Sequence, residues 1–227
     1  MLQVQDIHAS YGAGEVLFGV SMEINEDEVV CLLGRNGVGK STTLKAIMGM
    51  VPVSSGTVSF RGEDITRKRT DRIAKKGIGY VPEDREIFSF LTVRENLKMA
   101  EIGAKTSHRE KALAYFPKLK ELLDQEGGSL SGGEQQMLAI ARAVTGGADL
   151  MLLDEPSEGL APVIRGELVR VIHELKNEVA ILLVEQNLHL TLDLANRIYI
   201  MVSGAIAFMG TPQEVQEGRA VEKYLML

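Results

Sequence analysis

Short apolar runs recur along the chain and alternate with stretches in which apolar residues return every three or four positions. The first pattern is typical of strands buried in a parallel sheet, and the second of amphipathic helices. Buried strands are predicted at residues 29–33, 78–81, 150–155, 180–184 and 197–202. Helices are predicted at residues 42–48, 70–76, 136–144, 161–175 and 188–195. This alternation predicts an α/β fold with a mostly parallel sheet and helices on both faces.

The two ends of the chain add to this core. Residues 2–24 mix short apolar and polar alternations with glycine turns, which predicts antiparallel strands packed beside the core. A further strand, bounded by glycines, is predicted at 56–62. Near the other end we expect a strand at 205–208, paired with the one at 197–202, and a helical cap at 211–227.

From residue 92 to residue 123 the apolar period is helical and no strand pattern interrupts it. Gly103 separates two helical segments, and a turn at 126–128 ends the block. We therefore expect one domain over residues 1–227. Residues 92–130 would form an inserted α-helical subdomain, and residues 1–91 and 131–227 a core with its β-subdomain.

A glycine-rich stretch at residues 34–41, with the sequence GRNGVGKS, follows the first buried strand and precedes a helix. This is the context of a phosphate-binding P-loop, in which backbone N–H groups and the positive end of a helix face phosphate oxygens. Lys40 can reach the terminal phosphates, and the Ser41 hydroxyl can bind magnesium. The alternative is a chance glycine-rich turn, but the flanking strand and helix favour a nucleotide site.

Two acids, Asp154 and Glu155, stand at the end of the strand predicted at 150–155. Neighbouring side chains at a strand end point in different directions, so these carboxylates can hold different roles. Asp154 suits magnesium, reached through water, and Glu155 suits the positioning and polarising of an attacking water. The alternative is a pair of solvated acids at a turn.

A second anion site is predicted where Ser131, Gly132 and Gly133 open a helix, because a helix start exposes free N–H groups. Taken alone, this stretch can equally be an ordinary helix cap. Tyr11, at the first turn of the chain, offers a ring that can stack on a nucleobase or be an ordinary half-buried tyrosine.

Composition narrows the classes of function. Lys and Arg number 25 against 31 Asp and Glu, for a net charge of −6, so a nucleic-acid partner is not expected. The basic cluster at 67–69 is short and favours a solvated helix start. One cysteine, Cys31, excludes a disulfide within the chain and fits a reducing compartment. No apolar run is long enough to cross a bilayer, so any role at a membrane would be that of a peripheral protein.

The sequence resembles the ATP-binding subunits of ABC transporters over nearly its whole length. The motifs that carry the resemblance are the P-loop at 34–41, the signature LSGGEQQ at 130–136 and the Walker B strand at 150–154 with Glu155, in the family's order. The stretches at 79–83, 152–157, 159–162 and 183–187 resemble the LivF type, which serves branched-chain amino acid importers. The similar UrtE type, which serves urea importers, stays open as the alternative.

The resemblance implies a head-to-tail dimer with ATP between the P-loop of one subunit and the signature of the other. It implies ATP and Mg²⁺ as ligands, with Glu155, Lys40 and Gln186 as catalytic residues and Ser41, Asp154 and Glu83 at the metal. The expected nucleotide-binding residues are Tyr11, Gly34, Arg35, Asn36, Gly37, Val38, Gly39, Lys40, Ser41, Thr42, Glu83, Ser131, Gly132 and Gly133.

The same resemblance implies a P-loop NTPase core of the ABC ATPase type at the cytoplasmic face of the plasma membrane. Its partners would be transmembrane permease subunits, a second ABC ATPase subunit and, indirectly, a solute-binding protein outside the membrane. The helical subdomain and the loop around Glu83 would receive a cytoplasmic helix of the permease. Whether the ATPase pair consists of two copies or of two related chains stays open.

Three residues depart from the general family pattern: Glu83 replaces a usual glutamine, Gln186 a usual histidine and Ala161 a usual aspartate. Glutamine can donate a hydrogen bond to a γ-phosphate but cannot titrate, so a histidine proton relay is excluded. Glu83 can approach magnesium, although its negative charge lies near a triphosphate.

Other functions compete with transport. A non-transport member of the same superfamily would usually carry a coiled-coil insertion or two fused ATPase halves, and this sequence has one P-loop and no heptad run. A P-loop kinase or GTPase would leave the signature unexplained. A module that binds ATP without hydrolysing it is the third alternative.

Overall fold

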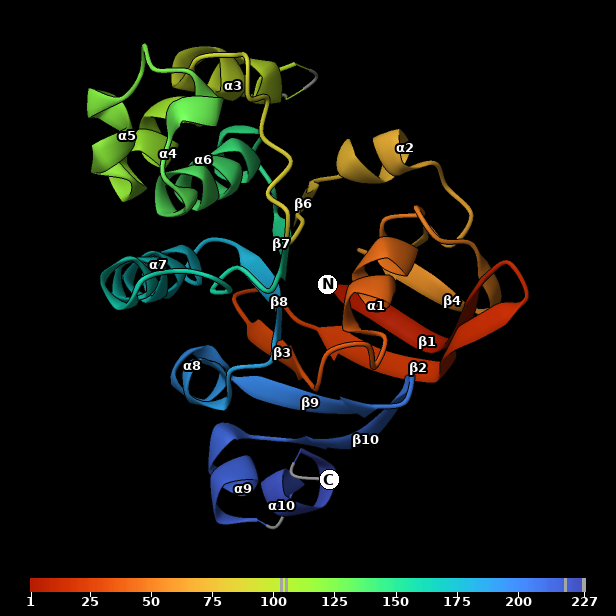
Figure 1. The fold of residues 1–227 in the computed structure, drawn as a ribbon. Helices are drawn as coiled ribbons and strands as arrows, with labels where there is room; N and C mark the ends of the chain where they lie inside the picture. Colours follow the sequence, from red (N-terminus) through yellow and green to blue (C-terminus); the bar gives the residue numbers. More distant parts are fainter. Residues whose placement is uncertain (103, 105, 219, 226–227) are drawn as a thin grey trace.

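A six-stranded sheet with the order β10-β9-β3-β8-β7-β6 runs through the centre of the protein (Figure 1). The structure is a computed structural model that describes residues 1–227 apart from 103, 105, 219 and 226–227. The parallel strands are β3 (Val29–Leu33), β6 (Ile78–Val81), β7 (Leu150–Asp154), β8 (Ala180–Glu185) and β9 (Arg197–Val202). Strand β10 (Ala205–Gly210) pairs antiparallel with β9. The predicted mostly parallel sheet is confirmed.

Side chains of the central strands alternate between two cores, as the period of a strand requires. In β3, Cys31 and Leu33 face the larger core, which contains the helices from α3 onward, while Val30 and Leu32 face the second. Both cores are sealed from solvent, which explains why these strands are apolar without interruption.

A second, antiparallel sheet has the order β2-β1-β4-β5 and covers the second core. It consists of β1 (Leu2–Tyr11), β2 (Gly14–Ile24), β4 (Val53–Phe60) and β5 (Glu63–Asp64). The antiparallel strands predicted at 2–24 are confirmed. The strand predicted to start at Gly56 instead starts at Val53, because Gly56 lies inside the strand as an irregularity opposite Asp6. A Cβ at Gly56 would stand 2.2 Å from the Asp6 carbonyl oxygen.

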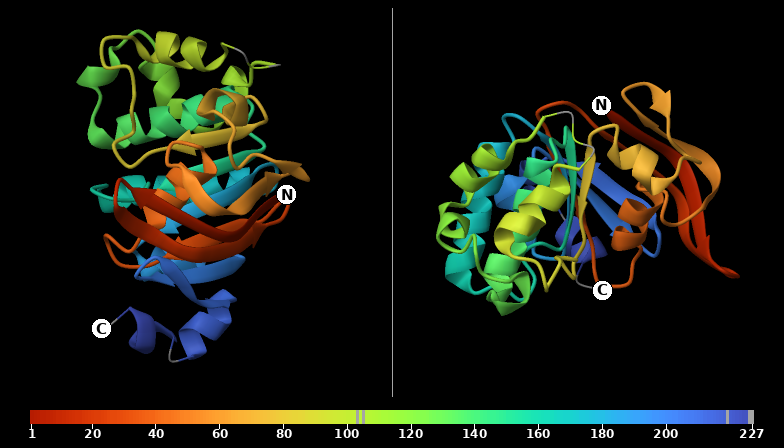
Figure 2. Two further views of the ribbon diagram at one scale, coloured as in Figure 1. Left: turned by 90° about the vertical axis from the view of Figure 1, so that its right-hand side faces the viewer. Right: turned by 90° about the horizontal axis from the view of Figure 1, so that it is seen from above.

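Helices cover the two faces of the central sheet unequally, as the view from above shows (Figure 2). On one face lie the longer helices α6 (Gly132–Thr145) and α7 (Pro162–Leu175) with α8 (Leu188–Leu194). On the other face α1 (Lys40–Ile47) shares the cover with the antiparallel sheet, next to α2 (Thr70–Ala74). The prediction of helices on both faces therefore holds, although a sheet forms much of the second cover. Helices α9 (Pro212–Glu217) and α10 (Ala220–Tyr224) lie near the end of the chain.

The helical block between β6 and β7 contains α3 (Val93–Ala100), α4 (Arg109–Tyr115), α5 (Pro117–Glu121), the short 3₁₀ turn η1 (Gly127–Ser129) and then α6. The prediction of two segments before the turn was wrong, because the second is broken at Pro117. A residue that precedes proline avoids the helical region of φ and ψ. Phe116 follows this rule, with φ −121° and ψ 71°. The predicted separator, Gly103, lies outside the described residues, and the subdomain limits stay a prediction.

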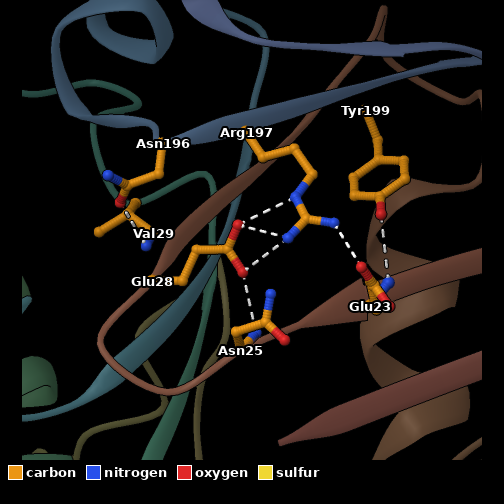
Figure 3. A network of polar contacts seen from close by, with 7 residues as sticks. All are labelled: Glu23, Asn25, Glu28, Val29, Asn196, Arg197 and Tyr199. Atoms are coloured by element: carbon orange, nitrogen blue, oxygen red, sulfur yellow. Dashed lines mark hydrogen bonds and ion pairs between the residues drawn. The ribbon is translucent and has the colours of Figure 1, made fainter.

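Arg197 joins the two sheets (Figure 3). Its guanidinium donates from Nε to Glu28 Oε1 (2.9 Å) and from Nη1 to Glu23 Oε1 (2.7 Å). Glu28 also accepts from the Asn25 N–H (2.8 Å). These two carboxylates raise the pKa of Arg197, so it stays charged and holds the end of β2 against the start of β3 and β9.

Within the described ranges no helix combines the length and apolar character that a membrane crossing requires.

Candidate active site

The glycine-rich loop leaves the end of β3, at the middle of the parallel sheet, and runs into α1. The Gly34 N–H donates to the Glu185 carbonyl oxygen at the end of β8 (3.3 Å). A Cβ at Gly34 would stand 2.7 Å from the Met201 carbonyl oxygen, and Gly39 has φ 111° with Leu17 beside it. The loop thus passes between two strand ends with no room for side chains at these two positions, which explains its glycines.

Lys40 and Glu155 meet at the base of this loop. Lys40 Nζ lies 2.9 Å from Glu155 Oε1, and both side chains are buried. The same ammonium donates to the Arg35 carbonyl oxygen (3.0 Å). Glu155 itself has a left-handed backbone, with φ 44°, directly after β7. The two residues predicted to act on phosphate and water therefore share one buried ion pair.

Ser41 and Asp154 form the second pair of the site. Ser41 Oγ donates to Asp154 Oδ1 (2.8 Å), and the Tyr80 hydroxyl donates to Asp154 Oδ2 (3.1 Å). Burial raises the pKa of Asp154, although both hydrogen bonds lower it. Burial and the neighbouring Asp154 also raise the pKa of Tyr80, so this phenol stays a donor. A buried carboxylate beside a hydroxyl is an oxygen donor set of the kind that Mg²⁺ prefers.

Three further carboxylates, those of Glu158, Glu185 and Glu83, act on Asp154, Glu155 or each other. Glu158 lies within hydrogen-bonding reach of Glu155, and this contact, with some burial, raises the pKa of Glu158. Burial raises the pKa of Glu185, whose Oε1 accepts from the Ser157 N–H (3.4 Å). The charge of Glu83 acts on both Asp154 and Glu158. This concentration of negative charge favours a cation, although no group of three His, Cys, Asp or Glu side chains among the described residues forms a ready metal site.

The helix start predicted as a second anion site belongs to α6. Ser131 caps α6 in a capping box with Glu134, and α6 packs in the core on the opposite face of the sheet from α1. Figure 1 shows α6 and α1 on the two sides of β6 and β7. A Cβ at Gly133 would stand 2.8 Å from Ile164 of α7, so this glycine also permits close packing of two helices. The predicted helix start at Gln136 was four residues late, because the capping box starts the helix at Gly132.

Three other residues considered from the sequence, Tyr11, Gln186 and Ala161, lie outside the two buried pairs. Tyr11 ends β1 opposite Gly14 and is about half exposed (52%). The following strand, β2, contacts the P-loop through Leu17, which packs beside Gly39. Gln186 is exposed in the bend after β8, next to Glu185. Ala161 stands at the N-cap of α7 and supplies no side-chain acceptor there.

Sequence reasoning did not identify Tyr80, Glu158 or Glu185 as parts of the site. Tyr80 comes to Asp154 because β6 pairs with β7 in parallel register, with Tyr80 opposite Leu152. The order of strands in the sheet is not written in the local pattern of either strand. Glu158 follows Glu155 by one turn of chain, and this spacing was the one available signal.

The family model described as ABC transporter matches residues 17–158. A branched-chain amino acid transport ATP-binding protein of Pseudomonas aeruginosa, BraG, is 42% identical over 93% of both chains. The probable counterpart LivF of Archaeoglobus fulgidus is 38% identical over 100% of this chain and 98% of its own. A crystal structure of a nucleotide-free ATP-binding cassette from an ABC transporter superposes with a TM-score of 0.85 at 28% identity, covering 96% of this chain and 94% of that one.

Proposed function

The chain belongs to the ABC transporter family of ATPases, and from that premise we propose that it energises the import of branched-chain amino acids. The chain binds nucleotide and hydrolyses ATP, as members of this family do. The substrate class is supported by the two amino acid transport relatives, each of which aligns with more than nine-tenths of the chain. Import of urea or short-chain amides is the alternative.

One observation carries the assignment of residues: the Lys40–Glu155 pair and the Ser41–Asp154 pair lie side by side, between the start of α1 and the end of β7. An ammonium, a hydroxyl and two carboxylates of different environment are the groups that phosphoryl transfer to water requires. Lys40 would bind the terminal phosphates, and Glu155, released from Lys40, would accept a hydrogen bond from the attacking water. Gln186 would donate a hydrogen bond to the γ-phosphate.

The magnesium part of the proposal rests on Ser41, Asp154 and Glu83. Ser41 and Asp154 already form a hydrogen-bonded pair, and the pKa of Asp154 is raised by burial, so a divalent cation would stabilise its ionised form. Bound Mg²⁺ would neutralise phosphate charge. Glu83, more exposed, would approach the same region from the loop after β6.

We further propose that ATP lies between two subunits. Helix α1, which follows the P-loop, and helix α6, which follows the signature turn, pack in the cores on opposite faces of the sheet, so we do not expect one nucleotide to bridge both stretches within one subunit. A partner placed head to tail would bring its Ser131 and Gly133 to the phosphates held by Lys40. The partner is a second ABC ATPase, either another copy or a related chain.

The membrane partner is a permease, and we propose that the helical block receives it. A groove of about 650 Å³ runs between α2, β6 and the ends of α3 and α6. Ile102 lines it and is 72% exposed, and Phe90, in the loop before α3, is 93% exposed. An exposed apolar side chain such as Ile102 in a groove gives a partner helix apolar surface to bury. We expect a cytoplasmic helix of the permease there.

Uptake of labelled leucine and labelled urea by cells with and without this chain tests the proposed function. Loss of leucine uptake alone supports an amino acid importer. Loss of urea uptake alone moves the chain to the amide-importing branch with the same mechanism. If neither changes, the proposed substrate class is wrong.

A further inference from the structure

The loop of residues 82–91 connects β6, at the nucleotide site, with α3 in the helical block. Its residues Arg85 and Glu86 both have a left-handed backbone, with φ of 67° and 44°. This region is unfavourable for residues that carry a Cβ, so the surroundings must hold the loop in its conformation. Three side chains do so.

Asn96 of α3 fixes the far end of the loop. It is fully buried, and its Oδ1 accepts from the Phe88 N–H (2.9 Å) while its Nδ2 donates to the carbonyls of Phe88 (2.9 Å) and Leu91 (3.1 Å). Its Nδ2 also donates to the Thr92 carbonyl (3.1 Å), so one amide holds four backbone groups and ties this end of the loop to α3.

Arg142 of α6 fixes the middle of the loop. Its Nη1 donates to the Glu86 carbonyl oxygen (2.7 Å), and its guanidinium carbon lies 4.6 Å from the centre of the Phe88 ring. A hydrogen bond from a charged donor and a cation–π contact act here together. The loop is therefore tied to α6, as well as to α3.

Arg85 ties the loop to the first turns of α6, next to the signature residues. Its Nε donates to Gln136 Oε1 (3.2 Å) and its Nη1 to Gln135 Oε1 (3.3 Å). The guanidinium lies against Gly132, where a Cβ would be 3.3 Å from Nη1. Gln136 is buried, and among the described residues its Nε2 has no hydrogen-bond partner. The bond from Arg85 satisfies the other polar atom of this side chain, Oε1.

The near end of the loop begins at the nucleotide site. Tyr80, two residues before Pro82, donates to Asp154, and the charge of Glu83 acts on the same carboxylate. Glu83 and Arg85 are separated by one residue. A change in the position of Glu83 at one nucleotide would therefore reach the start of α6 through Arg85.

We propose that Arg85 is a positioning residue that couples the Glu83 loop at one nucleotide site to the signature turn, Ser131 to Gly133, that completes the other. The inference rests on the proposed function, because the signature turn receives a nucleotide only in the paired arrangement. A planar guanidinium with donors to two glutamines fixes the orientation of this turn as well as its distance, which a lysine ammonium does not.

The test compares the purified full chain with its Arg85→Ala variant in two measurements. Titration with a fluorescent ATP analogue reports binding at the P-loop, which Arg85 does not touch, and the dissociation constant should stay within about twofold of wild type. Steady-state ATP hydrolysis reports the completed site, and kcat should fall about tenfold, a loss of about 1.4 kcal/mol. Arg94→Ala is the matched control, because it removes an arginine from the adjacent helix α3, where Arg94 pairs with exposed Asp124.

A double-mutant cycle with Gln136→Met distinguishes positioning from general loss of stability. Since both side chains belong to one contact, the double variant should lose no more kcat than the worse single variant. Losses that multiply to about a hundredfold, or an unchanged kcat in Arg85→Ala, overturn the inference. If Arg85→Ala does not fold, Arg85→Lys replaces it, and wild-type kcat in that variant also overturns the inference. Absence of hydrolysis by the wild-type chain would instead count against the proposed function, before any variant is compared.

Discussion

The buried pair of Lys40 and Glu155 makes the substitution Glu155→Gln informative in two directions. The amide keeps the shape of the side chain but cannot accept a hydrogen bond from water as a carboxylate does. Hydrolysis should be at least about 100-fold slower, a loss of about 2.7 kcal/mol of transition-state stabilisation. ATP binding, in contrast, should become tighter, because Glu155 contacts Lys40.

In the structure Lys40 Nζ lies 2.9 Å from the Glu155 carboxylate and 3.0 Å from the Arg35 carbonyl oxygen. The phosphates of ATP must take the place of that carboxylate at the ammonium. A hydrogen bond between charged groups contributes about 1.5–3 kcal/mol, so a neutral amide offers weaker competition. We expect the variant to bind ATP about tenfold more tightly, which corresponds to about 1.4 kcal/mol.

The assay is single-turnover hydrolysis of radiolabelled ATP, together with equilibrium binding under the same conditions. The control is Glu174→Gln, which changes an exposed carboxyl of α7 paired with Arg170 and leaves the Lys40 pair intact; its hydrolysis should stay within about threefold of wild type. Near-normal turnover in Glu155→Gln would remove Glu155 from the role assigned to it. Weaker ATP binding in that variant would refute the competition between carboxylate and phosphate.

Four other changes have defined outcomes. Ser131→Arg should leave ATP binding by the isolated chain intact while it blocks ATP-dependent pairing, and a sedimenting pair in that variant would sink the shared-site arrangement. Arg197→Met should lower the free energy of unfolding by about 2 kcal/mol and Tm by about 4–8 °C, whereas Arg94→Met, at an exposed pair, should change Tm by less than about 2 °C in thermal melts. Two lysines lower the pKa of Glu63 from its usual 4.5 to about 2, so its contribution to stability is present above pH 4.5 and is lost as the pH falls toward 2. Acid unfolding of Glu63→Gln should therefore approach that of wild type at pH 2; a constant difference down to that pH would contradict this. Gly34→Ala should abolish measurable ATP binding, because its Cβ would meet a backbone oxygen at 2.7 Å, and retained affinity would show that the loop can shift.

The parallel sheet could be predicted from sequence because its strands are buried on both faces. Residues 29–33 and 180–184 are apolar without a break, and each gives side chains to both cores. The glycine-rich turn between β3 and α1 could be located from sequence because it separates a buried strand from a helix, and two of its glycines, Gly34 and Gly39, leave no room for a side chain. Helix limits were less accessible, because they depend on capping. The hydrogen bonds between Ser131 and Glu134 extend α6 back to Gly132.

Contacts between segments distant in sequence could not be predicted from local patterns. Tyr80 reaches Asp154 only because β6 lies beside β7, and Arg85 reaches Gln136 across 51 positions. The ion pair of Lys40 with Glu155 belongs to the same class, since each residue was predicted for a separate role. Pairing of this kind follows from the order of strands, which the apolar pattern leaves open.

Leucine uptake by cells that lack the chain and carry either the wild type or Glu155→Gln tests the central claim most directly, provided that both proteins reach equal levels. The wild-type chain should restore uptake, and the variant should not, because import requires that ATP be hydrolysed by this subunit. Equal restoration by the two would contradict the claim that this chain energises transport.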